Sequence, residues 1–132
     1  MVILADRDRL SFLQATFIAG CIVGLFTGVS GFAADHEQLR QEGARHYSAG
    51  RYFQAIEAFE KALAGAPEEA RGLVKGDLAH ALAGLGFEYL SESEGRMAEE
   101  TFRKAIGVSE DYYANFGLGY LFFTRREDGE AR

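Results

Sequence analysis

The stretch from Gly43 to Pro67 limits the possible folds of this chain more than any other. It reads GARHYSAGRYFQAIEAFEKALAGAP. After the break at Ala49-Gly50, apolar residues return every three or four positions, at Tyr52, Ala55, Ile56, Phe59, Ala62 and Leu63. This spacing places one apolar stripe along a helix. Because the short link between the two helical patterns allows only a tight turn, we expect these helices to fold back as an antiparallel pair.

The same stretch resembles one unit of the tetratricopeptide repeat, a helix–turn–helix of about 34 residues. Eight residues agree in order with the family pattern: Gly43, Tyr47, Gly50, Tyr52, Ala55, Phe59, Ala62 and Pro67. Glu42 departs from it, since the family usually has leucine there. A single unit cannot bury its own apolar face. The resemblance therefore implies an all-α fold of antiparallel helix–turn–helix repeats stacked as a short α-solenoid.

A second, weaker copy of the unit follows the first. It is carried by Leu82, Leu85, Gly86, Tyr89, Ala98, Phe102 and Ala105. Phe102 lies 43 residues after Phe59, about nine more than the family period. We place the extra residues in a lengthened first helix that runs from Pro67 to about Leu90, followed by a helix from Arg96 to Val108.

A third copy begins at Leu118-Gly119 and is only partial. We expect an aromatic helix from Asp111 to about Arg125, and residues 125–130 resemble the next interhelical turn. The predicted helical repeat domain covers residues 35–132, with repeats over about 36–69 and 79–112 and a partial third over 112–132.

Residues 1–34 differ in kind from this domain. From Leu10 to Ala34 there are 25 residues without a charge. They fit a cleaved secretory signal, with Arg7 and Arg9 before the apolar run and small residues near its end. They also fit an apolar membrane-anchor helix, because 25 residues exceed the about 20 needed to cross a bilayer. In that helix Gly20, Gly24 and Gly28 would form a glycine ridge for close helix packing.

Lipidation is a third interpretation of this segment. Residues 18–21 (IAGC) resemble the lipobox of bacterial lipoproteins, in which the cysteine is acylated. After Cys21, however, the apolar run continues where lipoproteins usually become polar. All three interpretations predict a periplasmic or secreted domain of a bacterial envelope, possibly membrane-anchored, and membrane contact only through the N-terminal segment.

Charge and residue types exclude several classes of function. The formal net charge is −6, from 20 acidic and 14 basic residues, which disfavours nucleic acid as a partner. The histidines lack metal-ligand spacing, and no nucleophile lies near an acid–base pair, so we expect neither an enzyme nor a cofactor or metal. Asp77 and His80 share one helix face, where we expect a solvated pair.

The resemblance also implies a binding surface, because the first helix of each repeat lines a concave groove in this family. The corresponding residues here are Arg40, Tyr47, His80, Phe87, Leu90, Tyr113, Phe116, Tyr120 and Phe123. An alternative place for several of these aromatic residues is the core. Of the family residues that clamp a terminal carboxylate, only Arg40 remains. The groove predicts a protein–protein interaction module that binds an apolar or helical segment. The alternative is a structural protein that forms homo-oligomers through the glycine ridge and the aromatic last helix.

Overall fold

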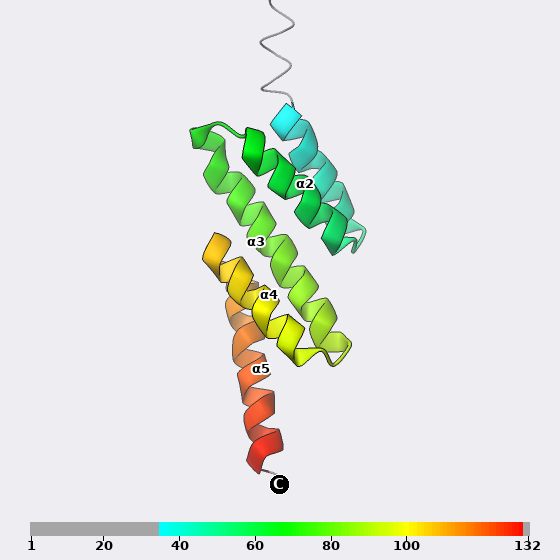
Figure 1. Ribbon diagram of the computed structural model, residues 1–132, viewed down its shortest axis with the longest axis vertical. Coiled ribbons are helices and arrows are strands. Elements are labelled where there is room, and N and C mark those ends of the chain that lie inside the picture. Colours follow the sequence, from blue (N-terminus) through cyan, green and yellow to red (C-terminus); the bar gives the residue numbers. More distant parts are fainter. Residues whose placement is uncertain (1–34, 131–132) are drawn as a thin grey trace, which may run out of the picture. The chain divides into compact units, whose positions relative to one another are not determined.

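The structure is a computed structural model that describes residues 35–130. Within this range short turns connect the helices, and no strand occurs. The helices are an opening helix over residues 35–48, α2 (Tyr52–Gly65), α3 (Glu68–Ser91), α4 (Gly95–Val108) and α5 (Tyr112–Glu130) (Figure 1). The predicted all-α fold is confirmed for these residues. The N-terminal segment, with its predicted helix, glycine ridge and Cys21, lies outside the described residues.

A tight turn joins the opening helix to α2. The amide of Gly50 donates to the carbonyl oxygen of Tyr47 at 2.9 Å, and that of Arg51 donates to His46 at 2.9 Å. Gly50 has a φ of +71°, a left-handed conformation that glycine adopts without steric penalty. The chain therefore reverses within three residues, and the predicted helical pair is present.

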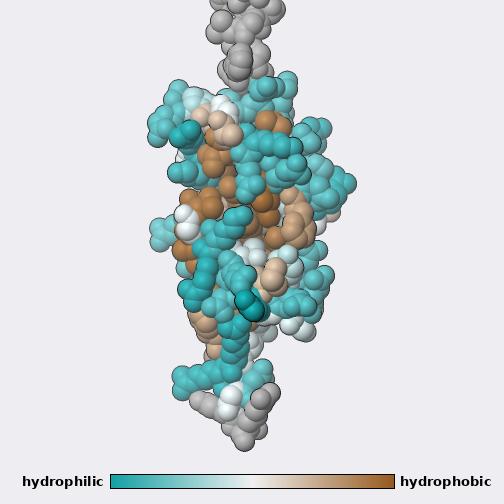
Figure 2. Space-filling model, in the orientation of Figure 1, coloured by the Kyte–Doolittle hydropathy of each residue, from teal (hydrophilic) through white to brown (hydrophobic). Residues whose placement is uncertain are grey.

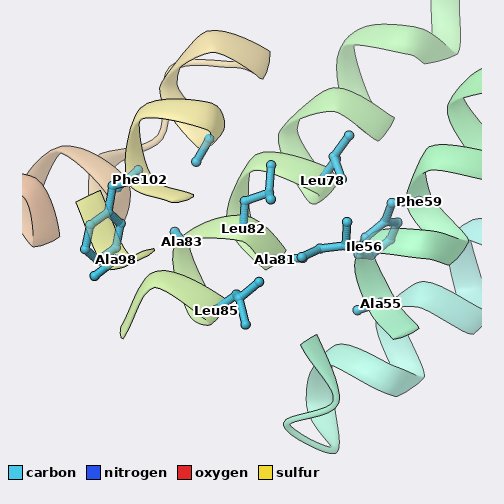
Figure 3. Packing of buried hydrophobic residues seen from close by; sticks show 12 residues of the cluster. Ala55, Ile56, Phe59, Leu78, Ala81, Leu82, Ala83, Leu85, Ala98 and Phe102 are labelled. Carbon is cyan, nitrogen blue, oxygen red and sulfur yellow. The ribbon is translucent and has the colours of Figure 1, made fainter. Parts of the chain in front are cut away.

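The long helix α3 belongs to both halves of the structure. It is uninterrupted, as predicted for the region after Pro67, and Glu68 and Glu69 occupy its first turn, where carboxylates favour the helix dipole. Figure 1 shows α3 between α2 and α4. In Figure 3, Phe59 from α2 and Phe102 from α4 approach α3 from opposite sides. Helix α3 thus packs apolar side chains against α2 on one side and against α4 on the other.

The two helical pairs share the same glycine–phenylalanine contact. A Cβ built on Gly43 would lie 2.7 Å from the ring of Phe59, and one on Gly86 would lie 2.5 Å from the ring of Phe102. In each case a glycine of the first helix meets a phenylalanine 16 residues later. These distances leave no room for a methyl group without movement of the ring. Glycine is therefore required where each ring crosses the first helix.

A shallow apolar area separates α2 from α4. Figure 2 shows hydrophobic surface along the middle of this face between hydrophilic margins. A hollow of about 310 Å³ there is lined by Phe53, Ile56, Leu82 and Leu85 together with polar residues. Lys104 of α4 and Glu60 of α2 form an ion pair of 3.6 Å across its margin. Exposed pairs of this kind contribute less than about 1 kcal/mol, so buried side chains hold the two pairs together.

The end of α5 differs from the prediction. We expected the helix to stop near Arg125 with a turn over residues 125–130, but it continues to Glu130. Arg125 ties this part of α5 to α4, because its guanidinium bonds the carboxylate of Glu99 and the carbonyl oxygen of Gly95. Residues 125–128 are exposed and include no proline, so the helix can continue through them. The predicted turn is therefore wrong.

The turn between α3 and α4 contains a strained residue. Ser93 has a φ of +65°, a conformation that costs an L residue about 1 kcal/mol or more but costs glycine little. The variant Ser93→Gly is expected to raise the free energy of unfolding by about 0.5–1 kcal/mol, measured by chemical denaturation. The matched control Ser91→Gly, at the end of α3, should lower it, since glycine weakens a helix. A loss of stability in both variants would contradict the assignment of strain to Ser93.

Candidate functional site

Two adjoining hollows lie along the first helices of the pairs. The first, of about 260 Å³, is lined by Arg40, Gln41, Ala44, Tyr47, Ser48, Phe59, Asp77 and His80. The second, of about 290 Å³, is lined by Tyr47, Tyr52, His80, Ala83, Gly84, Phe87 and Tyr113. Tyr47 and His80 belong to both. We call the two hollows together the aromatic groove.

Rings from different helices meet in the aromatic groove. The ring of His80, on α3, lies between Tyr47 of the opening helix and Tyr113 of α5, with centroid distances of 5.2 and 5.1 Å. Tyr52, at the start of α2, contacts Tyr47 edge to face at 5.7 Å. Contacts of this kind stabilise each ring pair by about 0.5–1.5 kcal/mol. The groove is therefore formed only when the opening helix, α2, α3 and α5 are packed together.

The absence of a side chain at Gly84 of α3 makes room for the ring of Tyr52 of α2. A Cβ built on Gly84 would lie 2.5 Å from the ring of Tyr52. Any other residue at position 84 would push this ring aside or force α2 away from α3. Gly84 therefore keeps the ring of Tyr52 in its position in the groove.

An aromatic row continues from the groove along α5. Phe87 contacts the buried Phe102 at 5.1 Å and the exposed Phe116 at 6.5 Å. Phe116 in turn stacks on Tyr112 at 6.5 Å, with an interplanar angle of 17°. The row therefore joins the core to the exposed surface of α5.

Asp111 connects the groove to the start of α5. Its Oδ1 accepts a hydrogen bond from the amide of Ala114 at 2.9 Å, which caps the helix. Its Oδ2 lies 3.2 Å from Nδ1 of His80. Because a carboxylate only accepts, His80 donates from Nδ1. Asp111 itself is buried, so the histidine is held by a carboxylate with little contact with water.

Arg40 is not available as a carboxylate clamp. Its Nε donates to Oδ2 of Asp77 at 2.6 Å, and Nη1 lies 3.4 Å from Oε2 of Glu37. The hydrogen bond that Arg40 donates to Asp77 raises the pKa of Arg40 above its ordinary value, and Glu37 adds to the effect. The predicted solvated pair of Asp77 and His80 is wrong, because each bonds a different helix: Asp77 the opening helix, and His80 the start of α5.

Burial raises the pKa of the Tyr47 phenol. Desolvation raises the pKa of its phenol, and the nearby Tyr52, Asp111 and Tyr113 raise it further because each disfavours a phenolate. Tyr47 is therefore a neutral hydroxyl at physiological pH, able to donate a hydrogen bond into the groove.

The predicted groove residues fall into three groups. Arg40, Tyr47, His80, Phe87 and Tyr113 line the aromatic groove. Phe116, Tyr120 and Phe123 are more than half exposed on α5, and Phe116 contacts Phe87 of the groove. Leu90 is half-buried against the core and lines neither hollow. The alternative place in the core thus applies to Leu90 and, in part, to Phe87, which also packs against the core.

Several residues that form or support the groove were missed by the sequence analysis, among them Tyr52, Gly84 and Asp111. Tyr52 and Gly84 line the second hollow, and Asp111 holds His80. Tyr52 was assigned only to the repeat pattern, and Asp111 only to the start of a helix. Their second roles depend on which helices meet, and periodicity within one helix carries no signal for that.

Neither a membrane-spanning helix nor a metal-binding cluster is found in the described part of the chain. No helix between residues 35 and 130 has both the length and the hydropathy needed to cross a membrane. No group of three or more metal-binding side chains occurs in that range either. Comparisons with protein-family models, with curated proteins and with solved structures gave no significant match.

Proposed function

We propose that this chain is a protein–protein interaction module, with tetratricopeptide-like helical pairs that stack as a short α-solenoid and bind a segment of a partner in the aromatic groove. The observation that carries the proposal is the meeting of Tyr47, His80 and Tyr113, from three helices, at one hollow surface. Aromatic side chains that are fixed by neighbours and still reach solvent are typical anchors of interfaces. Tyr113 is 51% exposed and Phe116 is 56% exposed, so both offer apolar area to a partner.

Site-specific photo-crosslinking tests this function. A photoreactive phenylalanine analogue at position 113 should capture a partner, while the same analogue at Phe53 should not. Phe53 is the matched control because it is 60% exposed on α2 and does not line the aromatic groove. Adding Tyr47→Ala should reduce capture at position 113 by about tenfold, since anchors of this kind contribute more than 1 kcal/mol to binding. Equal capture at both positions would count against the groove.

The proposed location is the envelope of a bacterium, with residues 1–34 as signal, anchor or lipidated segment. The uncharged stretch of 25 residues supports this placement. The intact mass of the mature protein tests it: removal of about 34 residues indicates a cleaved signal, the full mass an anchor, and added acyl groups after cleavage before Cys21 a lipoprotein. A full-length protein recovered from the cytoplasmic fraction would argue against all three.

A structural role through self-assembly is the second candidate. Gly119 of α5 has open space around it, whereas Gly43 and Gly86 each meet a phenylalanine. Tyr112, Tyr120, Phe122 and Phe123 of the same helix are also exposed. Contiguous exposed aromatic residues often mark a contact surface. If copies of the chain cover this helix, sedimentation should show a dimer or larger species that Phe123→Glu converts to monomer, while a monomeric parent protein would exclude the role.

A further inference from the structure

The second hollow of the aromatic groove is lined mostly by aromatic rings. Four of its seven lining residues are Tyr47, Tyr52, Phe87 and Tyr113, and a fifth is His80. An aromatic ring carries partial negative charge on its faces and therefore attracts a cation placed over it. The volume of about 290 Å³ lies at the lower end for ligand pockets and suits one side chain better than a whole cofactor.

Most of the charged groups around the aromatic groove are negative, and a negative charge also attracts a cation. Among its lining residues and the groups bonded to them are three carboxylates, Glu37, Asp77 and Asp111, and one guanidinium, that of Arg40. Arg40 is engaged by Asp77 and Glu37. Asp111 bonds the side chain of His80, and a neutral imidazole would not compensate its negative charge. The groove therefore carries an excess of negative charge beside aromatic rings.

We propose that the second hollow binds a cationic side chain, lysine or arginine, on the partner segment. The cation would lie against Tyr47 and Tyr113, with the buried carboxylate of Asp111 behind His80 adding a favourable field. This assignment deepens the proposed function and rests on it. An acidic side chain would be repelled by the buried carboxylate of Asp111, and an apolar one would gain nothing from its field.

The proposal is tested with two probes of similar shape and different charge. The full chain, with isotope-labelled tyrosine rings, is titrated with tetramethylammonium chloride and, separately, with tert-butyl alcohol at matched ionic strength. The ammonium ion should give saturable shifts of the rings of Tyr47 and Tyr113. The neutral probe should bind about tenfold more weakly, because a desolvated cation–π contact contributes about 1–2 kcal/mol.

Three variants separate the pocket from the rest of α5. Tyr113→Leu should weaken ammonium binding at least about fivefold, and Asp111→Asn should weaken it several-fold by removing the charge while keeping an oxygen for the helix cap. Tyr120→Leu is the matched control, since Tyr120 is 53% exposed on the same helix and lines neither hollow. Helicity by circular dichroism confirms that each variant is folded.

The outcomes distinguish this inference from the function on which it rests. Equal binding of both probes, or an equal loss with Tyr120→Leu, would overturn the cation site. If crosslinking from position 113 captures a partner but the ammonium ion gives no saturable shift, the groove function stands and the preference for a cation is wrong. If the ammonium ion binds but no partner is captured, the cation site stands and the interaction function is wrong.

Discussion

The variant Phe102→Ala is expected to lower the free energy of unfolding by about 3–5 kcal/mol, the largest effect of any single change considered in this chain. Phe102 is 0% exposed, and its ring lies against two glycines, Gly86 of α3 and Gly117 of α5. A Cβ at these glycines would be 2.5 and 2.3 Å from the ring. Its removal therefore opens a cavity where α3, α4 and α5 meet, and none of the three helices can collapse into it alone. Denaturant unfolding monitored by circular dichroism measures the loss.

Two further variants control for this result. Phe53→Ala removes the same side chain from a position that is 60% exposed, so the stability should change by less than about 1 kcal/mol. Phe102→Leu leaves part of the volume filled and should fall between the two. If Phe102→Ala lost no more stability than Phe53→Ala, the packing of α5 on the second pair would be wrong.

Glycine-to-alanine substitutions should have opposite effects beside Phe102 and in open space. Gly117→Ala forces a methyl group into the ring and should lower the free energy of unfolding by about 1–3 kcal/mol. Gly72→Ala, in α3, meets nothing within 4 Å and should raise it by up to about 1 kcal/mol, because alanine is the better helix former. The same substitution thus has opposite effects at a close contact and in open space.

The variant Asp111→Ala is expected to lower the free energy of unfolding by about 1.5–3 kcal/mol. It removes the cap of α5, where Oδ1 accepts from the amide of Ala114 at 2.9 Å, and the bond to His80 at 3.2 Å. The side chain of Asp111 is 10% exposed, so water cannot readily replace the cap, whereas that of His80 is 39% exposed and water compensates part of its loss. Thermal or denaturant unfolding gives the total.

Two further variants separate the loss of the helix cap from the loss of the bond to His80. Asp111→Asn keeps an oxygen for Ala114 and should cost about 1 kcal/mol or less. A double-mutant cycle with His80→Ala isolates the bond to the histidine, for which we expect a coupling of about 0.5–1 kcal/mol. A coupling near zero would show that Asp111 acts only as a helix cap and that His80 is positioned by the two tyrosines alone.

The helices could be predicted because the signals for them are local. The apolar stripe after Gly50 and the proline before α3 depend on residues within one or two turns of each other, and both predictions agree with the structure. The end of α5 was not predictable in the same way. Its last turns are supported by Arg125, which bonds Glu99 and Gly95 on another helix, and local composition contains no information on that contact.

Part of the candidate site could be predicted, because the faces of the helices follow from spacing along the chain. Tyr47, His80, Phe87 and Tyr113 could be proposed as groove residues because each occupies a corresponding face of a first helix, and the structure brings them together. Leu90 occupies a similar position but packs on the core, and Arg40 is bound by two carboxylates. Whether such residues bind a partner stays a prediction, which the crosslinking and titration experiments address.

The sequence by itself determined that this chain forms helices, where most of them begin and end, and which face of each is apolar, because these properties follow from spacing along the chain. Only the tertiary structure decided which charges cancel and which rings share a hollow. Those contacts join residues 37 and 31 positions apart, as in Arg40 with Asp77 and His80 with Asp111. Their geometry depends on how closely glycine lets the helices approach, which is a property of the packed molecule and not of any one segment.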